Sequence, residues 1–201
     1  MQRISIPEQG LAPNFIDSWL IEPLSLCDEI IDYFEGNWEQ QAAGETSEGL
    51  NLQVKNSVDL TINPRDLLGT QLTVFRTYFD ALFSCYRDYQ AEWPELGKLC
   101  QELNISRFTV QRYQSGQHYQ GVHSERSDLG ALHRLFAWMT YLNDVNPADG
   151  GSTLFTHYGL KIQPKRGLTL IWPAEWTHAH KGNVLLNGSK YIMTGWLHFA
   201  S

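Results

Sequence analysis

Two side chains with metal-binding chemistry lie close together near the middle of the chain. His123 and Glu125 are separated by a single serine, and side chains at i and i+2 of a strand point to the same side. A second histidine from a neighbouring strand would complete a set of two histidines and one carboxylate. That set is typical of non-haem Fe(II) and leaves other coordination positions open. The pair alone is a weak signal, because two ordinary polar residues on a strand have the same spacing.

Two later histidines compete for the third position. His178 and His180 both lie in the segment 177–181, which we predict to be a strand. Alternation along a strand places them on one face, so the residue types alone leave both open.

The neighbours of these residues form a longer motif with a defined order. Its members are Arg112-Tyr113-Gln114-Ser115-Gly116, His123-Ser124-Glu125, Arg134, Tyr141-Leu142-Asn143-Asp144, Gly150-Gly151-Ser152-Thr153-Leu154-Phe155, Pro164-Lys165-Arg166-Gly167, His180, Lys190 and Trp196. Their order and spacing resemble those of the 2-oxoglutarate- and Fe(II)-dependent oxygenases, in the prolyl 4-hydroxylase-like branch. The resemblance covers about residues 106–199, roughly half of the chain.

The resemblance implies a complete ligand set and a co-substrate. Fe(II) would be held by His123, Glu125 and His180, because the family's distal histidine precedes a basic residue by ten positions, as His180 precedes Lys190. The resemblance also implies 2-oxoglutarate as co-substrate, O2 as oxidant and ascorbate as reductant. Glu125 departs from the family pattern, in which most members have aspartate, and this puts the affinity for iron in doubt.

Further site residues are implied by their positions in the motif. The distal carboxylate of a bound keto acid would be buried, and a buried carboxylate must be paired. The residues implied to bind the co-substrate are Lys190, Tyr141, Tyr113, Trp196 and Thr153. Arg134 either lines the substrate side of the site or makes a structural salt bridge. His178 either contacts the metal ligands without binding the metal or lies at the rim of the site.

The implied reaction hydroxylates an unactivated C–H bond and releases succinate and CO2. The family default is a prolyl residue in a peptide, and another amino acid, peptide, protein or small molecule is an alternative. A cupin-like metalloenzyme could use His178 and His180 as its pair, but residues 181–187 lack the glutamate that cupins have there. A non-catalytic jelly-roll binding module would use His123 and Glu125 as ordinary polar residues.

The elements that must position these residues indicate an α+β fold. Helices are predicted over 24–35, 64–89 and 95–103. An apolar stripe at three- and four-residue spacing marks the second helix as a core helix; it consists of Leu68, Leu72, Phe75, Phe79, Leu82, Phe83 and Tyr86. Residues 37–60 are predicted as a connection with one or two strands, although such a loop could also cover a site.

Short strands dominate the second half of the chain. They are predicted over 105–113, 119–124, 132–142, 152–155, 160–163, 168–172, 177–181 and 190–199. Short strands with turn signals favour a sandwich or barrel, and helices that precede strands favour helices backing one sheet. We therefore expect a double-stranded β-helix (jelly roll) core backed by N-terminal helices. Residues 1–201 would form one domain, with helical support over about 1–104 and the catalytic core over about 105–199.

Alternation assigns side chains of 132–142 to two faces. Arg134 shares one face with Phe136 and Trp138, and Met139 and Tyr141 share the other. Both faces are largely apolar, so the strand should be covered on both sides.

Composition narrows the partners and the compartment. The chain has 201 residues and a formal net charge of −7, which repels phosphate backbones and acidic membrane surfaces. We expect neither nucleic acid nor a membrane as partner, and no signal peptide or membrane-spanning helix. Three widely spaced cysteines without a CxxC pair indicate free thiols and a cytoplasmic location. The oligomeric state does not follow from the sequence.

Overall fold

Two antiparallel sheets form the core of this computed structural model, which describes residues 1–3, 13–67, 69–100 and 102–199. Among these residues the larger sheet has the strand order β1-β2-β12-β9-β14-β7-β5-β3, with β6 also paired to β14. Its strands are β1 (Gln2–Arg3), β2 (Asp17–Leu20), β3 (Ala42–Ala43), β5 (Val58–Ile62), β6 (Leu103–Ile105), β7 (Phe108–Gln114), β9 (Arg134–Tyr141), β12 (Leu168–Pro173) and β14 (Ser189–Phe199).

The smaller sheet has the order β11-β10-β13-β8-β4. Its strands are β4 (Lys55–Asn56), β8 (His118–His123), β10 (Thr153–Phe155), β11 (Leu160–Ile162) and β13 (His180–Gly182). Buried residues from both sheets, such as Met139 and Tyr141 of β9 and Phe155 of β10, form one core cluster. The two sheets therefore pack face to face.

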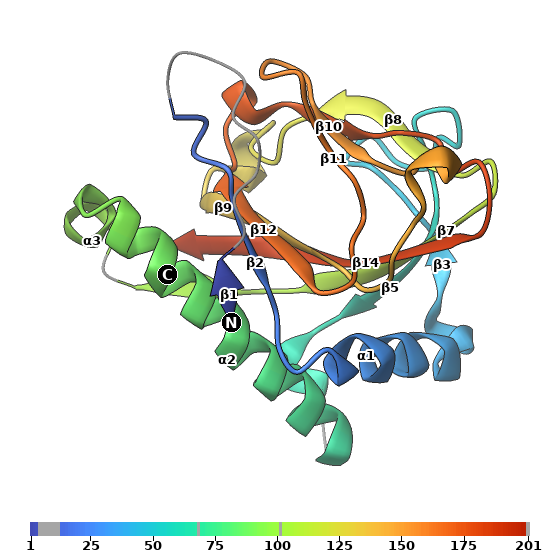
Figure 1. Cartoon of the computed structure of the whole chain (residues 1–201), viewed down its shortest axis with the longest axis horizontal. Coiled ribbons are helices and arrows are strands. Elements are labelled where there is room, and N and C mark those ends of the chain that lie inside the picture. Colours follow the sequence, from blue (N-terminus) through green and yellow to red (C-terminus); the bar gives the residue numbers. More distant parts are fainter. Residues whose placement is uncertain (4–12, 68, 101, 200–201) are drawn as a thin grey trace.

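Helices cover the other face of the larger sheet. Figure 1 shows α1 (Ser25–Gly36) and α2 (Gly69–Glu92) on one side of that sheet, with the smaller sheet on the opposite side. The stripe predicted for α2 packs there: Phe75, Leu82 and Tyr86 are buried against the sheet, and Phe79 and Phe83 are partly buried. Leu68 and the side chain of Leu72 lie outside the described residues.

A chain of buried hydroxyl groups joins α2 to the sheet. Tyr78 Oη lies 2.7 Å from Thr140 Oγ1, which lies 2.6 Å from Thr169 Oγ1. All three side chains are buried, so each hydroxyl needs the next one as a hydrogen-bond partner.

The remaining short helices are α3 (Glu95–Leu99) and the 3-10 turns η1 (Trp38–Gln40), η2 (Pro64–Asp66), η3 (Leu129–Ala131), η4 (Pro147–Asp149) and η5 (Trp176–His178). The helix predicted over 95–103 ends at Leu99, and Leu103–Ile105 is a strand. No helix in the described part of the chain is both long and apolar enough to cross a bilayer.

The predicted alternation is correct from Phe136 to Leu142 but fails at Arg134 and at Leu135, which packs on the helix side and not with Met139. Phe136 and Trp138 pack on the helix side, and Met139 and Tyr141 pack on the other side. Leu197 pairs with Phe136, but the next pair is His198 with Arg134, so Leu135 is an extra residue. An extra residue of this kind shifts the alternation for the side chains on its far side. Arg134, on the N-terminal side of Leu135, consequently faces the smaller sheet.

The strand predicted over 177–181 is also wrong in its first half. Residues Trp176–His178 form the 3-10 turn η5, and the strand β13 begins only at His180. His178 and His180 therefore do not share a strand face.

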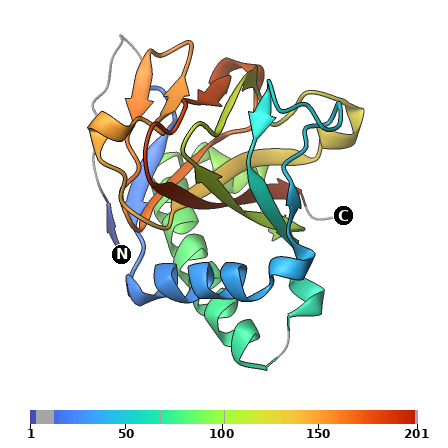
Figure 2. The same ribbon diagram turned by 90° about the vertical axis from the view of Figure 1, so that its right-hand side faces the viewer.

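Strands from the first part of the chain complete both sheets. β2 pairs with β12, β5 pairs with β7, and β4 pairs with β8. Figure 2 shows the cyan strands of the first half of the chain beside the olive strands of the second half.

Candidate metal centre

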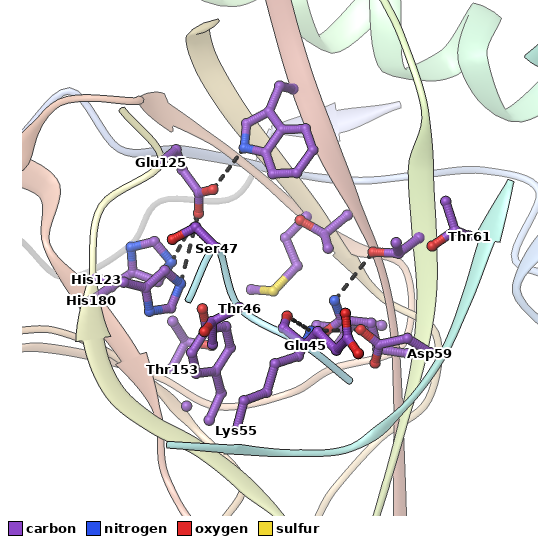
Figure 3. Close-up of a pocket in the computed structure, with 18 of the residues that line it drawn as sticks. Glu45, Thr46, Ser47, Lys55, Asp59, Thr61, His123, Glu125, Thr153 and His180 are labelled. Atoms are coloured by element: carbon purple, nitrogen blue, oxygen red, sulfur yellow. Dashed lines mark hydrogen bonds and ion pairs between the residues drawn. The ribbon is translucent and has the colours of Figure 1, made fainter. Parts of the chain in front are cut away.

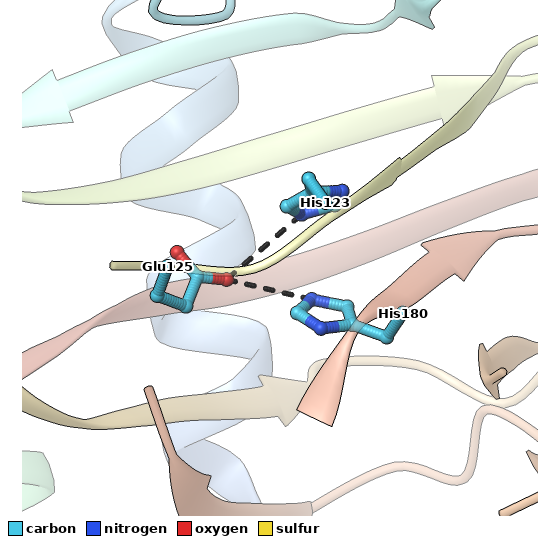
Figure 4. Close-up of side chains that lie close together, drawn as sticks. All are labelled: His123, Glu125 and His180. Atoms are coloured by element: carbon cyan, nitrogen blue, oxygen red, sulfur yellow. Dashed lines mark ion pairs between the residues drawn. The ribbon is translucent and has the colours of Figure 1, made fainter. Parts of the chain in front are cut away.

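Three candidate ligands converge at the end of the smaller sheet. His123 ends β8, His180 begins β13, and these two residues are direct partners in the antiparallel register. Glu125 follows β8 after one residue, and the ligand atoms of all three side chains lie within 4.8 Å of one another. Glu125 Oε1 is 3.4 Å from His180 Nε2 and 3.9 Å from His123 Nε2 (Figure 4). The set that the family resemblance implies therefore forms a compact cluster.

Backbone carbonyl groups hold both imidazole rings. His123 Nδ1 lies 2.9 Å from the Gly121 carbonyl oxygen, and His180 Nδ1 lies 3.0 Å from the His178 carbonyl oxygen. A carbonyl oxygen only accepts, so each Nδ1 carries a proton, and each Nε2 faces Glu125 Oε1. Hydrogen bonding of the outer nitrogen in this way is typical of metal-binding histidines.

Burial and neighbouring groups shift the pKa values of His123 and Glu125 towards the charge states that suit a bound cation. Burial and the neighbouring His180 lower the pKa of His123 to about 4, so its ring is neutral at pH 7. Burial raises the pKa of the Glu125 carboxyl, but contacts with His180, His123 and Trp196 outweigh burial and lower it to about 2. The neutral ring of His123, the imidazole of His180 and one carboxylate form a donor set that fits a divalent metal such as Fe(II).

The side chain of Glu125 is held from its far end. Trp196 Nε1 donates a hydrogen bond of 2.6 Å to Glu125 Oε2. The guanidinium of Arg134 stacks over the Trp196 ring at 3.6 Å and donates a 2.9 Å hydrogen bond to the carbonyl oxygen of Glu125. Of the two roles predicted for Arg134, the structure shows a position on the cavity wall.

His178 does not join this cluster. It is buried in η5, where its Nε2 lies 2.8 Å from the carbonyl oxygen of Asn14. Its backbone, and not its imidazole, contributes to the centre by holding His180.

The metal centre opens into a cavity of about 670 Å³. Four of the predicted co-substrate residues line it, namely Lys190, Tyr113, Trp196 and Thr153. Figure 3 shows Thr153 on the same side of the cavity as the two histidines. Tyr141 lies behind this wall, where its hydroxyl donates a 2.6 Å hydrogen bond to Thr153 Oγ1.

Lys190 is a buried cation in the wall of this cavity. Lys190 is only 3% exposed, so other protein atoms and not solvent surround its side chain. Its Nζ donates to the Gly151 carbonyl oxygen at 3.0 Å and lies 4.2 Å from the centre of the Tyr113 ring. Within the described residues no carboxylate lies at ion-pair distance from it. Burial lowers its pKa to about 8, and a buried cation of this kind is stabilised by an anionic ligand.

The turn that presents the Gly151 carbonyl requires glycine. Gly150 and Gly151 have φ values of 75° and 69°, a conformation that residues with a Cβ adopt rarely. A Cβ on Gly150 would lie 2.4 Å from the Val184 carbonyl oxygen. The Gly-Gly pair of the motif is thus explained by its backbone.

Part of the cavity wall comes from residues 40–47, which lie in the segment 37–60 that the sequence predicts mainly as a connection. Six residues of this segment line the cavity, namely Gln40, Ala42, Ala43, Glu45, Thr46 and Ser47. Figure 3 labels the last three among the residues that line it. Lys55 anchors this segment, because its Nζ bonds to Asp59 Oδ2 at 2.5 Å and to the Glu45 carbonyl oxygen at 3.3 Å. No short sequence pattern marks these contacts; they depend on the pairing of β3 with β5 and of β4 with β8.

Comparisons with known proteins agree with this geometry. A model of the 2OG-Fe(II) oxygenase superfamily matches residues 108–198. Prolyl 4-hydroxylase subunit alpha-1 of Homo sapiens is 27% identical over 112 residues, which cover 49% of this chain and 20% of that protein. The Gallus gallus protein of the same name is 30% identical over 78 residues, 35% of this chain and 15% of that protein. The chain thus spans about one fifth or less of the length of these relatives.

Solved structures resemble the whole fold. A Pseudomonas putida prolyl-4-hydroxylase matches with a TM-score of 0.70 at 17% identity, over 95% of this chain and 96% of that chain. A Trichoplax adhaerens prolyl hydroxylase, solved with a peptide fragment of the hypoxia inducible factor oxygen degradation domain, matches with a TM-score of 0.71 at 14% identity, over 92% and 84%. The viral collagen prolyl hydroxylase of Paramecium Bursaria Chlorella virus-1, in complex with 2OG, matches with a TM-score of 0.66 at 18% identity, over 93% and 97%. The expected α+β jelly-roll fold is confirmed.

Proposed function

We propose that the chain is a 2-oxoglutarate-dependent Fe(II) dioxygenase of the 2OG-Fe(II) oxygenase superfamily, whose model matches residues 108–198. The proposed reaction converts 2-oxoglutarate, O2 and a substrate C–H bond into succinate, CO2 and an alcohol. The observation that carries this proposal is the cluster of half-buried His123 and Glu125 with buried His180, beside a cavity that is also lined by a buried lysine. A structural ion pair would not need two imidazoles with both Nε2 atoms turned towards one carboxylate oxygen.

The protein residues have distinct tasks in this proposal. Bound Fe(II) supplies the activation of O2, and His123, Glu125 and His180 hold it. Lys190 neutralises the distal carboxylate of 2-oxoglutarate. Thr153 donates a hydrogen bond to the same carboxylate, since its oxygen already accepts the proton of Tyr141 and its own proton is available. Tyr141 therefore acts through Thr153 and not directly on the ligand.

The cavity provides the enclosure that the reaction requires. Residues 40–47 lie over one side of it, and the buried strands β7, β9 and β14 form the other. Water exclusion protects a reactive centre from side reactions. The protein thus contributes position and shielding, while the metal contributes the difficult chemistry.

The proposed substrate is a prolyl residue within a peptide. The similarity to prolyl 4-hydroxylase alpha subunits and to a hydroxylase solved with a peptide supports this choice. Another amino-acid side chain remains the alternative, and a screen of proline-containing peptides against other peptides and free amino acids separates the two. We also propose a reducing compartment for the protein, because Cys27, Cys85 and Cys100 are all free and buried.

The test is anaerobic addition of Fe(II) and 2-oxoglutarate to the metal-free protein. We expect one Fe(II) per chain, a visible charge-transfer band, and succinate after O2 is admitted. His123→Ala should abolish the band and reduce succinate formation at least about 100-fold, because it removes one of three ligands. His133→Ala is the matched control, since His133 is exposed and does not line the cavity.

The alternatives give different results in the same experiment. A cupin-like metalloenzyme would bind metal but form no succinate from 2-oxoglutarate. A non-catalytic binding module would bind no stoichiometric iron, and a wild-type protein without the band would contradict the proposed function.

A further inference from the structure

We infer that Trp196, supported by Arg134, is a positioning residue that makes Glu125 a ligand through one oxygen only. This inference rests on the proposed metal centre and deepens it. It addresses the one place where the ligand set departs from the usual aspartate, because glutamate has an additional methylene and more freedom of rotation.

The two carboxylate oxygens of Glu125 have different partners. Oε1 faces the Nε2 atoms of His180 and His123, at 3.4 and 3.9 Å. Oε2 accepts the 2.6 Å hydrogen bond from Trp196 Nε1. An indole N–H can only donate, so it cannot exchange roles with a metal ion. It fixes Oε2 and leaves Oε1 for the metal.

Arg134 holds both ends of this arrangement. Its guanidinium lies 3.6 Å from the centre of the Trp196 ring, and its Nη1 donates to the carbonyl oxygen of Glu125 at 2.9 Å. The ring is therefore fixed from one face, and the backbone of Glu125 is fixed by the same side chain. This contact exists only because the extra residue Leu135 turns Arg134 to the cavity side of β9.

The arrangement determines how many metal positions remain open. A carboxylate that binds through one oxygen leaves a position that binding through two oxygens would fill. The proposed chemistry needs positions for the keto acid and for O2. An aspartate at position 125 would reach less far, and its second oxygen would lie away from the Trp196 N–H. Metal binding should consequently depend on Trp196 when residue 125 is glutamate, and not when it is aspartate.

A double-mutant cycle tests this dependence with Co(II) as the probe metal and no co-substrate. The four proteins are wild type, Trp196→Phe, Glu125→Asp and the double variant. In the wild-type background we expect Trp196→Phe to weaken Co(II) binding about 10- to 100-fold, as is typical when a group behind a ligand is removed. The ligand-field bands of Co(II) should also change in intensity, because released Glu125 can bind through both oxygens. In the Glu125→Asp background the same change should alter Co(II) affinity less than about threefold.

Equal losses in both backgrounds would overturn the inference, since a general packing role of Trp196 does not depend on residue 125. Trp93→Phe is the matched control, because the Trp93 indole N–H is buried without a hydrogen-bond partner in the described part of the chain. It should leave Co(II) affinity unchanged. If Trp196→Phe does not fold, Arg134→Gln carries the same test, with a loss expected beside glutamate and not beside aspartate.

The proposed function and this inference fail in different ways. A wild-type protein that binds no Co(II) or Fe(II) contradicts the proposed metal centre itself. A wild-type protein that binds metal, with losses that are additive over the cycle, contradicts only the role of Trp196.

Discussion

At the scale of single residues, Lys190 should make the affinity for 2-oxoglutarate depend on pH. Its pKa is lowered to about 8 by burial, and a carboxylate ligand binds the protonated form. Below pH 8 the lysine is already charged and the affinity is constant. Above pH 8 binding must take up a proton, so the Kd should rise up to about tenfold per pH unit. Calorimetric titration between pH 7 and 9.5 measures this slope.

Lys190→Arg separates this effect from other ionisations. Arginine stays charged throughout the range, so its profile should be flat even if the affinity is lower. A slope that is the same in Lys190→Arg would show that another group titrates.

Residue chemistry was predictable where a motif fixed the spacing. The sequence indicated His123, Glu125 and His180, and these three side chains converge. It did not indicate the hydrogen bond from Trp196 to Glu125, because the two residues lie on β14 and after β8 and meet only in the folded chain. Tyr141 was predicted to bind the co-substrate, and in the structure its hydroxyl donates a hydrogen bond to Thr153, which lines the cavity.

At the scale of elements, the hydroxyl chain between α2 and the larger sheet makes a prediction about stability. Thr140→Val removes the partner of the Tyr78 hydroxyl, which is buried. An unsatisfied buried hydroxyl costs about 1–3 kcal/mol. We expect the free energy of unfolding to fall by that amount in urea denaturation, with the m-value unchanged.

A second substitution identifies the cause. Adding Tyr78→Phe to Thr140→Val removes the orphaned hydroxyl, so the double variant should be more stable than the sum of the two single losses predicts. Thr77→Val is the control, since Thr77 is exposed on the same helix, and it should change the stability by less than about 0.5 kcal/mol. Strict additivity of the two core changes would contradict this explanation.

The faces of the strands could be predicted where apolar and polar side chains alternate regularly. They could not be predicted where one extra residue interrupts the alternation. Alternation gave the correct faces for Phe136, Trp138 and Met139. It failed at Arg134, because a bulge shifts the period by one residue and leaves no local signature. It failed at His178 for a related reason: one 3-10 turn precedes the strand that begins at His180.

At the scale of the whole molecule, metal binding should stabilise the fold measurably. The ligands come from β8, the residues after it and β13, which are adjacent only in the folded sheet. A metal at about 100 times its Kd adds about 2.7 kcal/mol, which for a domain of this size raises Tm by about 5–10 °C. Thermal unfolding with and without Co(II), followed by addition of a chelator, measures this shift.

Two histidine variants show whether the predicted ligand is used. His180→Ala should lose the Co(II)-dependent rise in Tm. His178→Ala should keep it, although its metal-free form is less stable because the contact with Asn14 is lost. The opposite pattern would assign the third ligand to His178.

The global arrangement was the least predictable level. The order of helices and strands was enough for an α+β fold with helices on one sheet, which the structure confirms. The pairing of β5 with β7 and of β4 with β8 joins residues far apart in the chain. Such pairings depend on the packing of the complete chain and not on local preference, so the contribution of residues 40–47 to the cavity was not visible in the sequence.

Because residues 40–47 form part of the cavity wall, the candidate site is built from two separate stretches of the chain. The family-matching stretch, 108–198, contains the three candidate metal ligands and Lys190. The segment that closes the cavity lies well before it. The candidate ligands and one wall of the cavity thus come from separate stretches of the chain, and substitutions in 40–47 should change the shape of the cavity without altering a candidate ligand.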